Sequence, residues 1–535
     1  MTPLLTLAQL RAVETAAQAA LPARTLMSRA GAAIADAALA LDADDFLLLA
    51  GPGNNGGDAF EAAARLHRAG RRATVLAFGD LGRLTPDSAG AVALCRAAGL
   101  PIRPAADLVG LLRPDRRQCV IDGLFGIGLQ RAPGGEYRAA IERVNAHPGP
   151  VLAIDLPSGI DGDSGAVVGG ADGIAVRATL TVTMIGDKPG LHTGAGLVHA
   201  GRVTVAPIGL DTEAAAAASA WLNAPDGFAA LLAPRALDSH KGNSGDLRII
   251  GGSAGMTGAA VLAARAGLLA GAGRVFAHTL ADAPAYDPIH PEIMWRPVPA
   301  EGGSPGLKAG GEAAGPASVI APPASGALVI GPGLGQSAEA RDLLAALLPV
   351  ADRLVLDADA LNLVAATPAL QAALAARAGT GLRPAVLTPH PLEAARLLAA
   401  TRASDGAARA APPPDAGLVN ADRPAVAAEL ARHYASVVAL KGAGTVVAAP
   451  DGRLRINPTG NPALATGGTG DVLAGLAGAL LARDDDAFEV ACAAVWLHGR
   501  AADELVAAGI GPVGLAAGEL APAIRTLLNR LTRPA

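Results

Sequence analysis

The chain alternates short, wholly apolar runs with longer segments whose apolar residues recur at helical spacing, and this alternation constrains the fold most. Strands buried on both faces of a sheet read as continuous apolar runs, and helical segments between them fit crossover connections. The pattern predicts an α/β protein with mostly parallel sheets covered by helices on both faces. The predicted strands are residues 46–50, 74–78, 119–121, 151–154 and 180–184, then 247–250, 274–278, 328–330, 354–356, 385–387 and 437–440.

Two domains are expected, because 535 residues exceed one typical domain. The alanine-rich segment 212–220 carries no strand signal and is followed by Pro225 and Gly227. The alternation restarts near Leu247, so the domain junction is predicted around this segment. Two Pro/Gly/Ala-rich stretches, 300–326 and 401–424, interrupt the second half and are interpreted as insertions or surface loops without chemistry.

Composition excludes several classes of protein. Hydrophobic residues make up 51% of the chain but aromatic ones only 2%, so the cores are built from Ala, Leu and Val. The net charge of -5 and the lack of a long basic tract give no support to binding of nucleic acid or anionic membranes. The three cysteines are far apart, and neither a signal peptide nor a long apolar span is visible, so a soluble cytoplasmic protein is expected.

The most informative chemical motif reads NPALATGGTGDVLAG from Asn461 to Gly475. Its glycines let backbone N–H groups converge on an anion, and the apolar run 472–481 predicts a helix whose N-terminus points at the same place. Asp471 beside such a cradle suits activation of a hydroxyl for phosphoryl transfer. The alternative interpretation is a glycine turn in which Asp471 merely caps the helix.

Polar residues follow three predicted strands of the first half. The motif GPGNNGGD comes directly after residues 46–50, and Asp122 and Asp155 end two further strands. Because ligands of open α/β sheets bind at the carboxyl ends of strands, Asn55, Asp122, Asp155 and Ser158 are expected to converge. Their oxygens suit a hard cation, with one carboxylate left for acid–base work. The alternative is a tight turn with Asp58 as a helix cap.

The motifs GPGNNGGD, DGLFGIG, DLPSGIDGDSG and GDKPGL resemble those of the YjeF-type NAD(P)H-hydrate epimerases over nearly all of residues 1–213. The resemblance implies that Asp155 is the acid–base group and that Asn55, Asp122 and Ser158 hold a potassium ion. A departure is Ser28, where the family commonly has Glu, and this affects only local packing. The implied contacts to the hydrated nucleotide are Asn54, Asn55, Gly56, Gly57, Asp58, Gly126, Ile127, Gly128, Leu129, Gln130, Arg131, Ala132 and Asp155.

The second half carries six glycine- or acid-containing turns at strand ends, each weak alone. His390 by itself is more often structural or solvated, and Lys441 also fits a surface lysine at a hairpin. Their order, closed by the Asn461–Gly475 motif, resembles the ADP/ATP-dependent NAD(P)H-hydrate dehydratases of the ribokinase-like superfamily over residues 226–535. The resemblance implies that Lys441, Gly442, Ala443, Gly444, Thr445 and Gly470 hold the adenine nucleotide, and that Ala259, Gly333 or Gly335, His390 and Asp471 face the hydrated dinucleotide.

Together the two resemblances imply an N-terminal Rossmann-like and a C-terminal ribokinase-like domain, each a three-layer αβα structure, in one bifunctional repair enzyme. It is expected to epimerise the R and S hydrates of NADH and NADPH and to dehydrate the S form with ADP, Mg²⁺ and K⁺, giving AMP and phosphate. Nothing in the residues excludes ATP. We expect small-molecule partners only and a homo-oligomer. Two alternatives stay open: a vitamin or sugar kinase of the ribokinase-like class, and a first half that binds ligand without catalysis.

Overall fold

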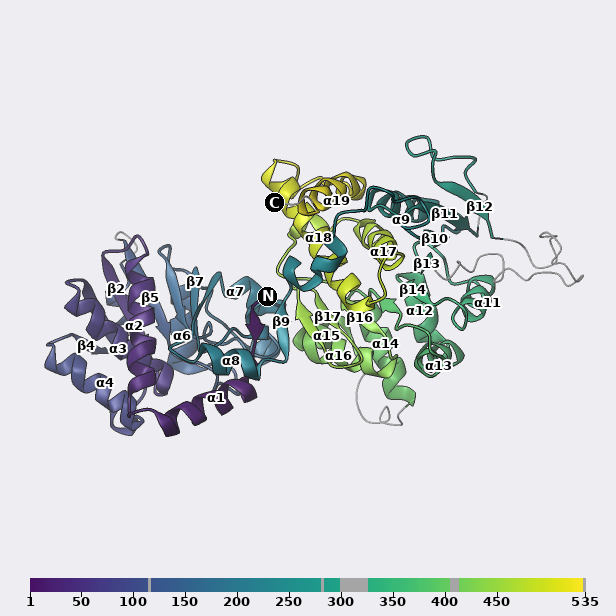
Figure 1. Ribbon diagram of the computed structural model, residues 1–535. Helices are drawn as coiled ribbons and strands as arrows, with labels where there is room; N and C mark the ends of the chain where they lie inside the picture. The colour runs from purple at the N-terminus through teal and green to yellow at the C-terminus, as the bar shows by residue number, and fades with distance from the viewer. Residues whose placement is uncertain (114–116, 281–282, 299–325, 405–412, 533–535) are drawn as a thin grey trace, which may run out of the picture. The chain divides into compact units, whose positions relative to one another are not determined.

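The computed structural model describes residues 1–113, 117–280, 283–298, 326–404 and 413–532 (Figure 1). It divides into two compact units, Thr2–Trp221 and Leu222–Ala535 with Met1. The boundary falls inside a short strand, β9 (Ala220–Leu222), which pairs antiparallel with β1 (Pro3–Leu4). This strand was not predicted, because the alanine-rich segment before it has no strand signal. Residues 211–217 of that segment form the helix α8 (Asp211–Ala217).

The N-terminal unit is built on a seven-stranded sheet of order β4-β3-β2-β5-β6-β7-β8. All its neighbouring strands are parallel, as the continuous apolar runs predict. The carboxyl ends of β2, β5 and β6 therefore meet at one edge of the sheet. The strands are β2 (Asp45–Ala50), β3 (Arg72–Ala77), β4 (Ile102–Pro104), β5 (Gln118–Gly123), β6 (Val151–Ile154), β7 (Leu180–Met184) and β8 (Arg202–Ala206).

Helices cover both faces of this sheet. Phe46 and Leu48 of β2 pack with α1 (Leu7–Ala20), α2 (Thr25–Leu39), α3 (Asn54–Arg68) and α4 (Pro86–Ala97). Leu47 and Leu49, which point to the other side, pack with α5 (Leu108–Leu111) and α6 (Gly135–Asn145). α7 (Gly194–His199) lies before β8. The prediction of a three-layer αβα domain is confirmed.

The C-terminal unit has strands in the order β18-β17-β16-β15-β14-β13-β10-β11-β12. From β12 to β16 the pairs are parallel, while β17 and β18 add an antiparallel edge that was not predicted. The strands are β10 (Asp246–Gly251), β11 (Arg274–Thr279), β12 (Met294–Pro297), β13 (Gly326–Ile330), β14 (Arg353–Leu356), β15 (Val386–Leu387), β16 (Val437–Leu440), β17 (Val446–Ala448) and β18 (Leu454–Ile456).

Two groups of helices enclose this sheet (Figure 1). On one face Leu247, Ile249 and Val329 pack against α9 (Thr257–Leu269), α17 (Thr469–Leu481), α18 (Ala487–Ala507) and α19 (Ala517–Leu531). Small residues let α9 and α17 approach closely, because a Cβ on Gly475 would lie 2.0 Å from the Ala263 carbonyl oxygen. The second group is α11 (Ala338–Leu347), α12 (Asp359–Ala366), α13 (Pro368–Ala376), α14 (Pro391–Ser404), α15 (Ala416–Ala421) and α16 (Arg423–His433).

Several local expectations need correction. α3 begins at Asn54 rather than near residue 59, and its N-cap is Gly53, so Asp58 is no cap. The N-cap of α17 is Gly468, so Asp471 does not cap that helix either. Stretch 401–424 is not one loop, since it contains the end of α14, the whole of α15 and the start of α16. Its residues 405–412, and 299–325 of the other predicted insertion, lie outside the described residues.

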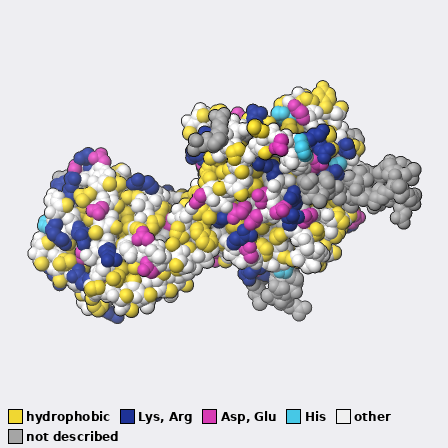
Figure 2. All heavy atoms as spheres, in the orientation of Figure 1, with side chains coloured by type: hydrophobic (Ala, Val, Ile, Leu, Met, Phe, Trp, Pro, Cys, Tyr) yellow, Lys and Arg dark blue, Asp and Glu magenta, His cyan; other side chains and the backbone are white. Residues whose placement is uncertain are grey.

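On the face of the molecule in Figure 2, Lys and Arg side chains are interspersed with Asp and Glu side chains and with apolar ones. This mixture fits the small net charge of -5. Within the described ranges, no helix combines the length and the apolar character that crossing a bilayer requires.

Candidate active sites

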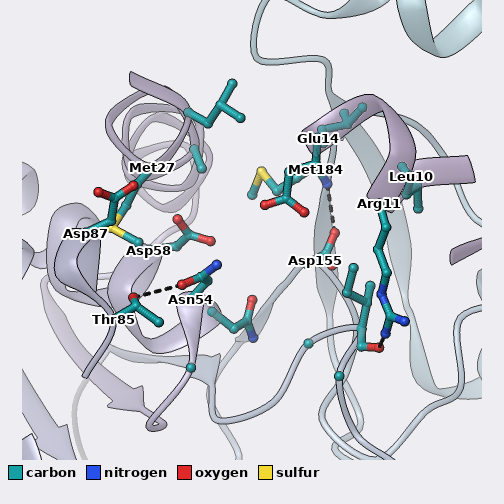
Figure 3. Close-up of a pocket in the computed structure, with 18 of the residues that line it drawn as sticks. Leu10, Arg11, Glu14, Met27, Asn54, Asp58, Thr85, Asp87, Asp155 and Met184 are labelled. Atoms are coloured by element: carbon teal, nitrogen blue, oxygen red, sulfur yellow. Dashed lines mark hydrogen bonds between the residues drawn. The ribbon is translucent and has the colours of Figure 1, made fainter. Parts of the chain in front are cut away.

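A cavity of about 1230 Å³ lies in the N-terminal unit at the carboxyl edge of its sheet (Figure 3). The loops after β2, β5 and β6 line it together with α1, as the strand order dictates. Ten of the predicted contact residues line it: Asn54, Asn55, Asp58, Gly126, Ile127, Gly128, Leu129, Gln130, Arg131 and Asp155.

Three predicted contact residues do not line the cavity. A Cβ on Gly56 would lie 1.9 Å from the Gly51 carbonyl oxygen, and one on Gly57 would lie 2.4 Å from Ser88 Oγ. Both glycines therefore let α3 pack closely against its neighbours. Ala132 lies against Gly169, where an added Cβ would be 2.4 Å from the Ala132 Cβ.

The predicted potassium ligands are gathered behind one wall of this cavity. Ser158 donates from its backbone N–H and from Oγ to the Asp122 carboxylate, at 2.8 and 2.7 Å. Asn55 Nδ2 donates to the Phe125 carbonyl at 3.0 Å, and Phe125 N–H donates to Ser158 Oγ at 2.8 Å. Asp122 is 0% exposed, and burial raises its pKa to about 6 although these hydrogen bonds act in the opposite direction. Hydrogen bonds through Phe125 thus link Asn55, Asp122 and Ser158, while Asp155, the fourth residue expected to converge with them, lines the cavity.

Asp155 follows β6 and occupies the left-handed region, with a φ of 66°. Its Oδ1 accepts hydrogen bonds from Met184 N–H at 3.0 Å and from Lys188 Nζ at 2.7 Å. Because a non-glycine residue adopts this backbone conformation at a cost of about 1–3 kcal/mol, the surrounding contacts must hold it there. The strained turn aims the carboxylate into the cavity (Figure 3).

In the C-terminal unit the glycine motif forms the start of α17, and Asp471 lies in the first turn. Among the described residues, none donates a hydrogen bond to the Asp471 carboxylate. Burial and the nearby Asp357 carboxylate raise the pKa of Asp471 to about 6, while the Lys441 ammonium acts in the opposite direction. A carboxyl with such a pKa is ionised near neutral pH and is still a useful base.

Lys441 follows β16 and reaches the same place. Its Nζ donates to Asp357 Oδ1 at 2.8 Å, and a Cβ added to Gly470 would lie 3.3 Å from this nitrogen. Burial alone would lower the pKa of Lys441, but the carboxylates of Asp357, Glu393 and Asp471 together raise it. The lysine does lie at the β16–β17 hairpin, yet only 20% of its side chain is exposed. It therefore places a permanent positive charge beside the α17 N-terminus, where anions bind.

Each of the remaining predicted residues has contacts of its own. His390 lies 3.4 Å from Glu393, measured from Nε2 to Oε1, and burial and the Lys441 charge lower its pKa. Gly333 and Ala259 are neighbours, since a Cβ on Gly333 would lie 3.1 Å from the Ala259 Cβ. Gly335 N–H donates to Asp359 Oδ2 at 2.9 Å, and the Asp359 charge in turn helps to raise the pKa of Asp471. Gly442 to Thr445 form the hairpin turn, closed by Thr445 Oγ1 donating to the Gly442 carbonyl at 3.2 Å.

Sequence reasoning gave no role to three residues that shape these sites. Lys188 and Glu14 both line the N-terminal cavity, and Asp357 holds Lys441 in the C-terminal unit. The signal for Lys188 was present in the GDKPGL motif, and Asp357 follows a predicted strand. Glu14 lies on the first helix, far in sequence from every strand end, and carries no such signal. In the described part of the chain, His, Cys, Asp and Glu side chains form no group of three suited to a metal ion.

Comparison with known proteins gives consistent matches over both units. Residues 23–190 match the model of the family described as YjeF-related protein N-terminus, and residues 247–524 match the NAD(P)H-hydrate dehydratase family. The chain is 35% identical to the bifunctional NAD(P)H-hydrate repair enzyme Nnr of Coxiella burnetii, covering 99% of this chain and 100% of the relative. It is 34% identical to the Nnr of Escherichia coli strain K12, covering 91% of this chain and 86% of the relative. A crystal structure of ADP/ATP-dependent NAD(P)H-hydrate dehydratase from Bacillus subtilis aligns with 27% identity and a TM-score of 0.43, covering 58% of this chain and 99% of that one.

Proposed function

Because this chain belongs to the family of bifunctional NAD(P)H-hydrate repair enzymes, we propose that it restores hydrated NADH and NADPH in two steps. The N-terminal domain, residues 1–213, interconverts the R and S hydrates. The C-terminal domain, residues 226–535, dehydrates the S form at the expense of ADP and releases AMP and phosphate. The observation that carries the second activity is the position of the Asp471 carboxylate at the N-terminus of α17. This carboxylate accepts no hydrogen bond from the described residues, and the Lys441 ammonium lies beside Gly470.

In the dehydration step, hydroxide is a poor leaving group and is converted into a phosphate ester. Asp471 takes the proton of the C6 hydroxyl as that oxygen attacks the terminal phosphoryl group of ADP. The amide groups at the start of α17 and the Lys441 ammonium stabilise the charge that develops on the phosphoryl oxygens. A Mg²⁺ ion accompanying the nucleotide would add positive charge at the same phosphoryl oxygens. The ring nitrogen then assists departure of phosphate and becomes an iminium nitrogen. Loss of a proton from C5, which the departing phosphate can accept, restores the ring double bond of the reduced dinucleotide.

The epimerisation is assigned to the cavity of the N-terminal unit, with Asp155 as its acid–base group. Asn55, Asp122 and Ser158 would hold a K⁺ ion beside it. The donor set supports this assignment, because Asp122 is a fully buried carboxylate whose described hydrogen-bond partners are all uncharged. A bound ion would supply a fixed positive charge at the loop after β5, and the proton transfers do not pass through it.

A direct assay uses hydrated NADH with ADP and Mg²⁺ and follows recovery of the NADH absorbance. The repair function predicts that both epimers are recovered, with AMP and phosphate formed in equal amounts and no lasting phosphorylated product. A kinase would instead accumulate a stable phosphate ester. Parallel reactions with ATP test the choice of ADP, and reactions in which lithium replaces potassium test the K⁺ site, since only R-hydrate consumption should slow.

A cytoplasmic homo-oligomer completes the proposal. The three cysteines are free and buried, which suits a reducing compartment. Light scattering of the purified full chain tests the oligomeric state.

A further inference from the structure

Glu14 has no role in the account above, although its side chain reaches into the N-terminal cavity from α1 (Figure 3). Gln18, one turn later, donates to Glu14 Oε1 at 3.1 Å and fixes the orientation of the carboxyl group. The helix itself is anchored over the cavity. Leu7 N–H donates to Asp163 at 2.7 Å, and Arg11 donates to the Ile127 carbonyl at 2.9 Å. Glu14 is thus held at a fixed place in the cavity wall.

Lys188 lies beneath the same wall and is 1% exposed. Besides the 2.7 Å contact to Asp155 Oδ1, its ammonium donates to Thr183 Oγ1 at 2.6 Å and to the Met184 carbonyl at 3.3 Å. A buried ammonium needs an anionic partner, and Asp155 is the carboxylate that contacts it. The pair places a positive charge 2.7 Å from the Asp155 carboxylate.

The surroundings of Glu14 differ from those of Asp155. Burial, and then the Asp155 charge, raise the pKa of Glu14, while Lys188 and Arg11 act in the other direction. Across the cavity, burial and then the charges of Asp155 and Glu14 raise the pKa of Asp58 as well (Figure 3). Two carboxyl groups on one cavity, one in contact with an ammonium and the other in surroundings that raise its pKa, fit the roles of a general base and a general acid.

We propose that Glu14 and Asp155 form the acid and the base of one proton-transfer pair, with Lys188 as a positioning residue that holds the Asp155 carboxylate in place. Glu14 becomes a second catalytic residue of the N-terminal site. The inference rests on the proposed epimerase function and specifies its mechanism.

The chemistry balances without any further reagent. Asp155 takes the proton of the C6 hydroxyl, the C6–N1 bond breaks, and C6 becomes an aldehyde. The electron pair of the broken bond stays on N1, which takes the proton of Glu14. Rotation about the C5–C6 bond presents the other face of the aldehyde, and N1 adds to it as both protons return to their donors. The product is the other epimer, and both carboxyl groups regain their starting states.

The test compares Glu14→Gln with Glu142→Gln in the full chain, starting from purified R hydrate and separating the epimers by chromatography. Glu142 is the matched control, because it lies on the exposed surface of α6 outside the cavity. Glu14→Gln should lower kcat for R-hydrate consumption by about 100-fold or more with little change in KM, as loss of an acid–base group does. Glu142→Gln should match the parent. A Glu14→Gln enzyme within about threefold of the parent would overturn the proposal.

Two further measurements guard against a purely structural effect of the substitution. Glu14→Asp keeps a carboxyl group and should regain part of the lost rate, and a failure to do so in a folded protein counts against the role. In oxygen-18-labelled water the product should retain the original hydroxyl oxygen, whereas uptake of one solvent oxygen per inversion would contradict ring opening.

A Lys188→Met variant tests the positioning role through the separate values of kcat and KM. Without the contact to Asp155, kcat for R-hydrate consumption should fall while KM changes little, and Lys188→Arg should regain part of the rate. An unchanged kcat in Lys188→Met would remove Lys188 from the mechanism. A failure of the epimerase assignment itself would give a different result, because the parent enzyme would then consume R hydrate no faster than the spontaneous reaction.

Discussion

Both units of the molecule place a buried lysine–aspartate pair at the carboxyl edge of a parallel sheet, yet the two pairs are used differently. In the N-terminal unit Lys188 contacts Asp155, the proposed catalytic group, at 2.7 Å. In the C-terminal unit Lys441 contacts Asp357 at 2.8 Å and leaves the proposed base, Asp471, without a hydrogen-bond donor among the described residues. The ion pair thus contacts the proposed base of one site directly, and in the other it delivers positive charge next to a proposed base whose pKa is raised.

This difference matches what each reaction requires. A proton shuttle between two carboxyl groups needs no strong electrophile, so the lysine serves only the base. Phosphoryl transfer develops charge on phosphoryl oxygens, so a lysine beside the helix N-terminus acts on the substrate. Both lysines follow a strand end, and a parallel sheet has several strand ends along the same edge.

The largest expected effect comes from Asp155→Asn, which keeps the shape of the side chain and removes the base. R-hydrate consumption should fall by about 10²–10⁴-fold toward the spontaneous rate, while S-hydrate dehydration by the same preparation stays within about twofold. The two rates are measured separately on purified epimers. If both rates fell together, the two units would not act as independent sites.

Breaking the two ion pairs should affect stability unequally. Lys441→Met leaves Asp357, 2% exposed, as an uncompensated buried charge and should cost about 3–5 kcal/mol. Lys188→Met should cost less, because the Asp155 side chain is 14% exposed and lines the cavity. Calorimetry with and without ADP identifies the transition of the C-terminal unit as the one that the nucleotide shifts. An equal loss in both variants would contradict the comparison.

The pH dependence should separate the sites further. Because Asp471, the proposed base, has a pKa of about 6, S-hydrate dehydration should fall about tenfold per unit as the pH drops below this value. Folding raises the pKa of Asp471, so protonation of its carboxylate adds to the stability of the folded state as the pH falls. The expected loss of rate is therefore not caused by unfolding through this group. A flat kcat profile between about pH 7 and pH 5 would exclude Asp471 as the base.

The smallest effect concerns helix packing. Alanine at Gly475 would place a Cβ 2.0 Å from the backbone oxygen of Ala263, whereas alanine at Gly31 would meet the Glu61 side chain at 2.4 Å. Backbone yields less readily than a side chain, so Gly475→Ala should cost about 1–3 kcal/mol and Gly31→Ala less. Thermal unfolding of the two variants measures the difference, and a larger loss for Gly31→Ala would contradict it.

Much of the fold was predictable from local pattern. Wholly apolar runs such as Val151–Ile154 and Val437–Leu440 are strands with the predicted bounds, because strands buried on both faces admit no other composition. The antiparallel strands β17 and β18 were missed, since they are three residues long and follow a hairpin whose glycines resemble a loop. The start of α3 was missed because Asn and Gly are poor helix formers, and here tertiary packing overrides that propensity.

The site was predictable only where motif and strand end coincide. The gathering of Asn55, Asp122 and Ser158 followed from parallel strands that share one edge. Glu14 could not be found this way, because α1 reaches the cavity through long-range packing that no local pattern encodes. The pairing of Lys441 with Asp357, 84 residues apart, likewise depends on the order of strands in the sheet.

The most direct test of the two-site account is a single-turnover reaction of Asp471→Asn with purified S hydrate, ADP and Mg²⁺. NADH recovery should fall by about 10²–10⁴-fold while R-to-S conversion by the same protein is unchanged. Recovery of NADH at the rate of the parent enzyme would show that another group takes the hydroxyl proton, and the chemistry assigned to the C-terminal unit would be wrong.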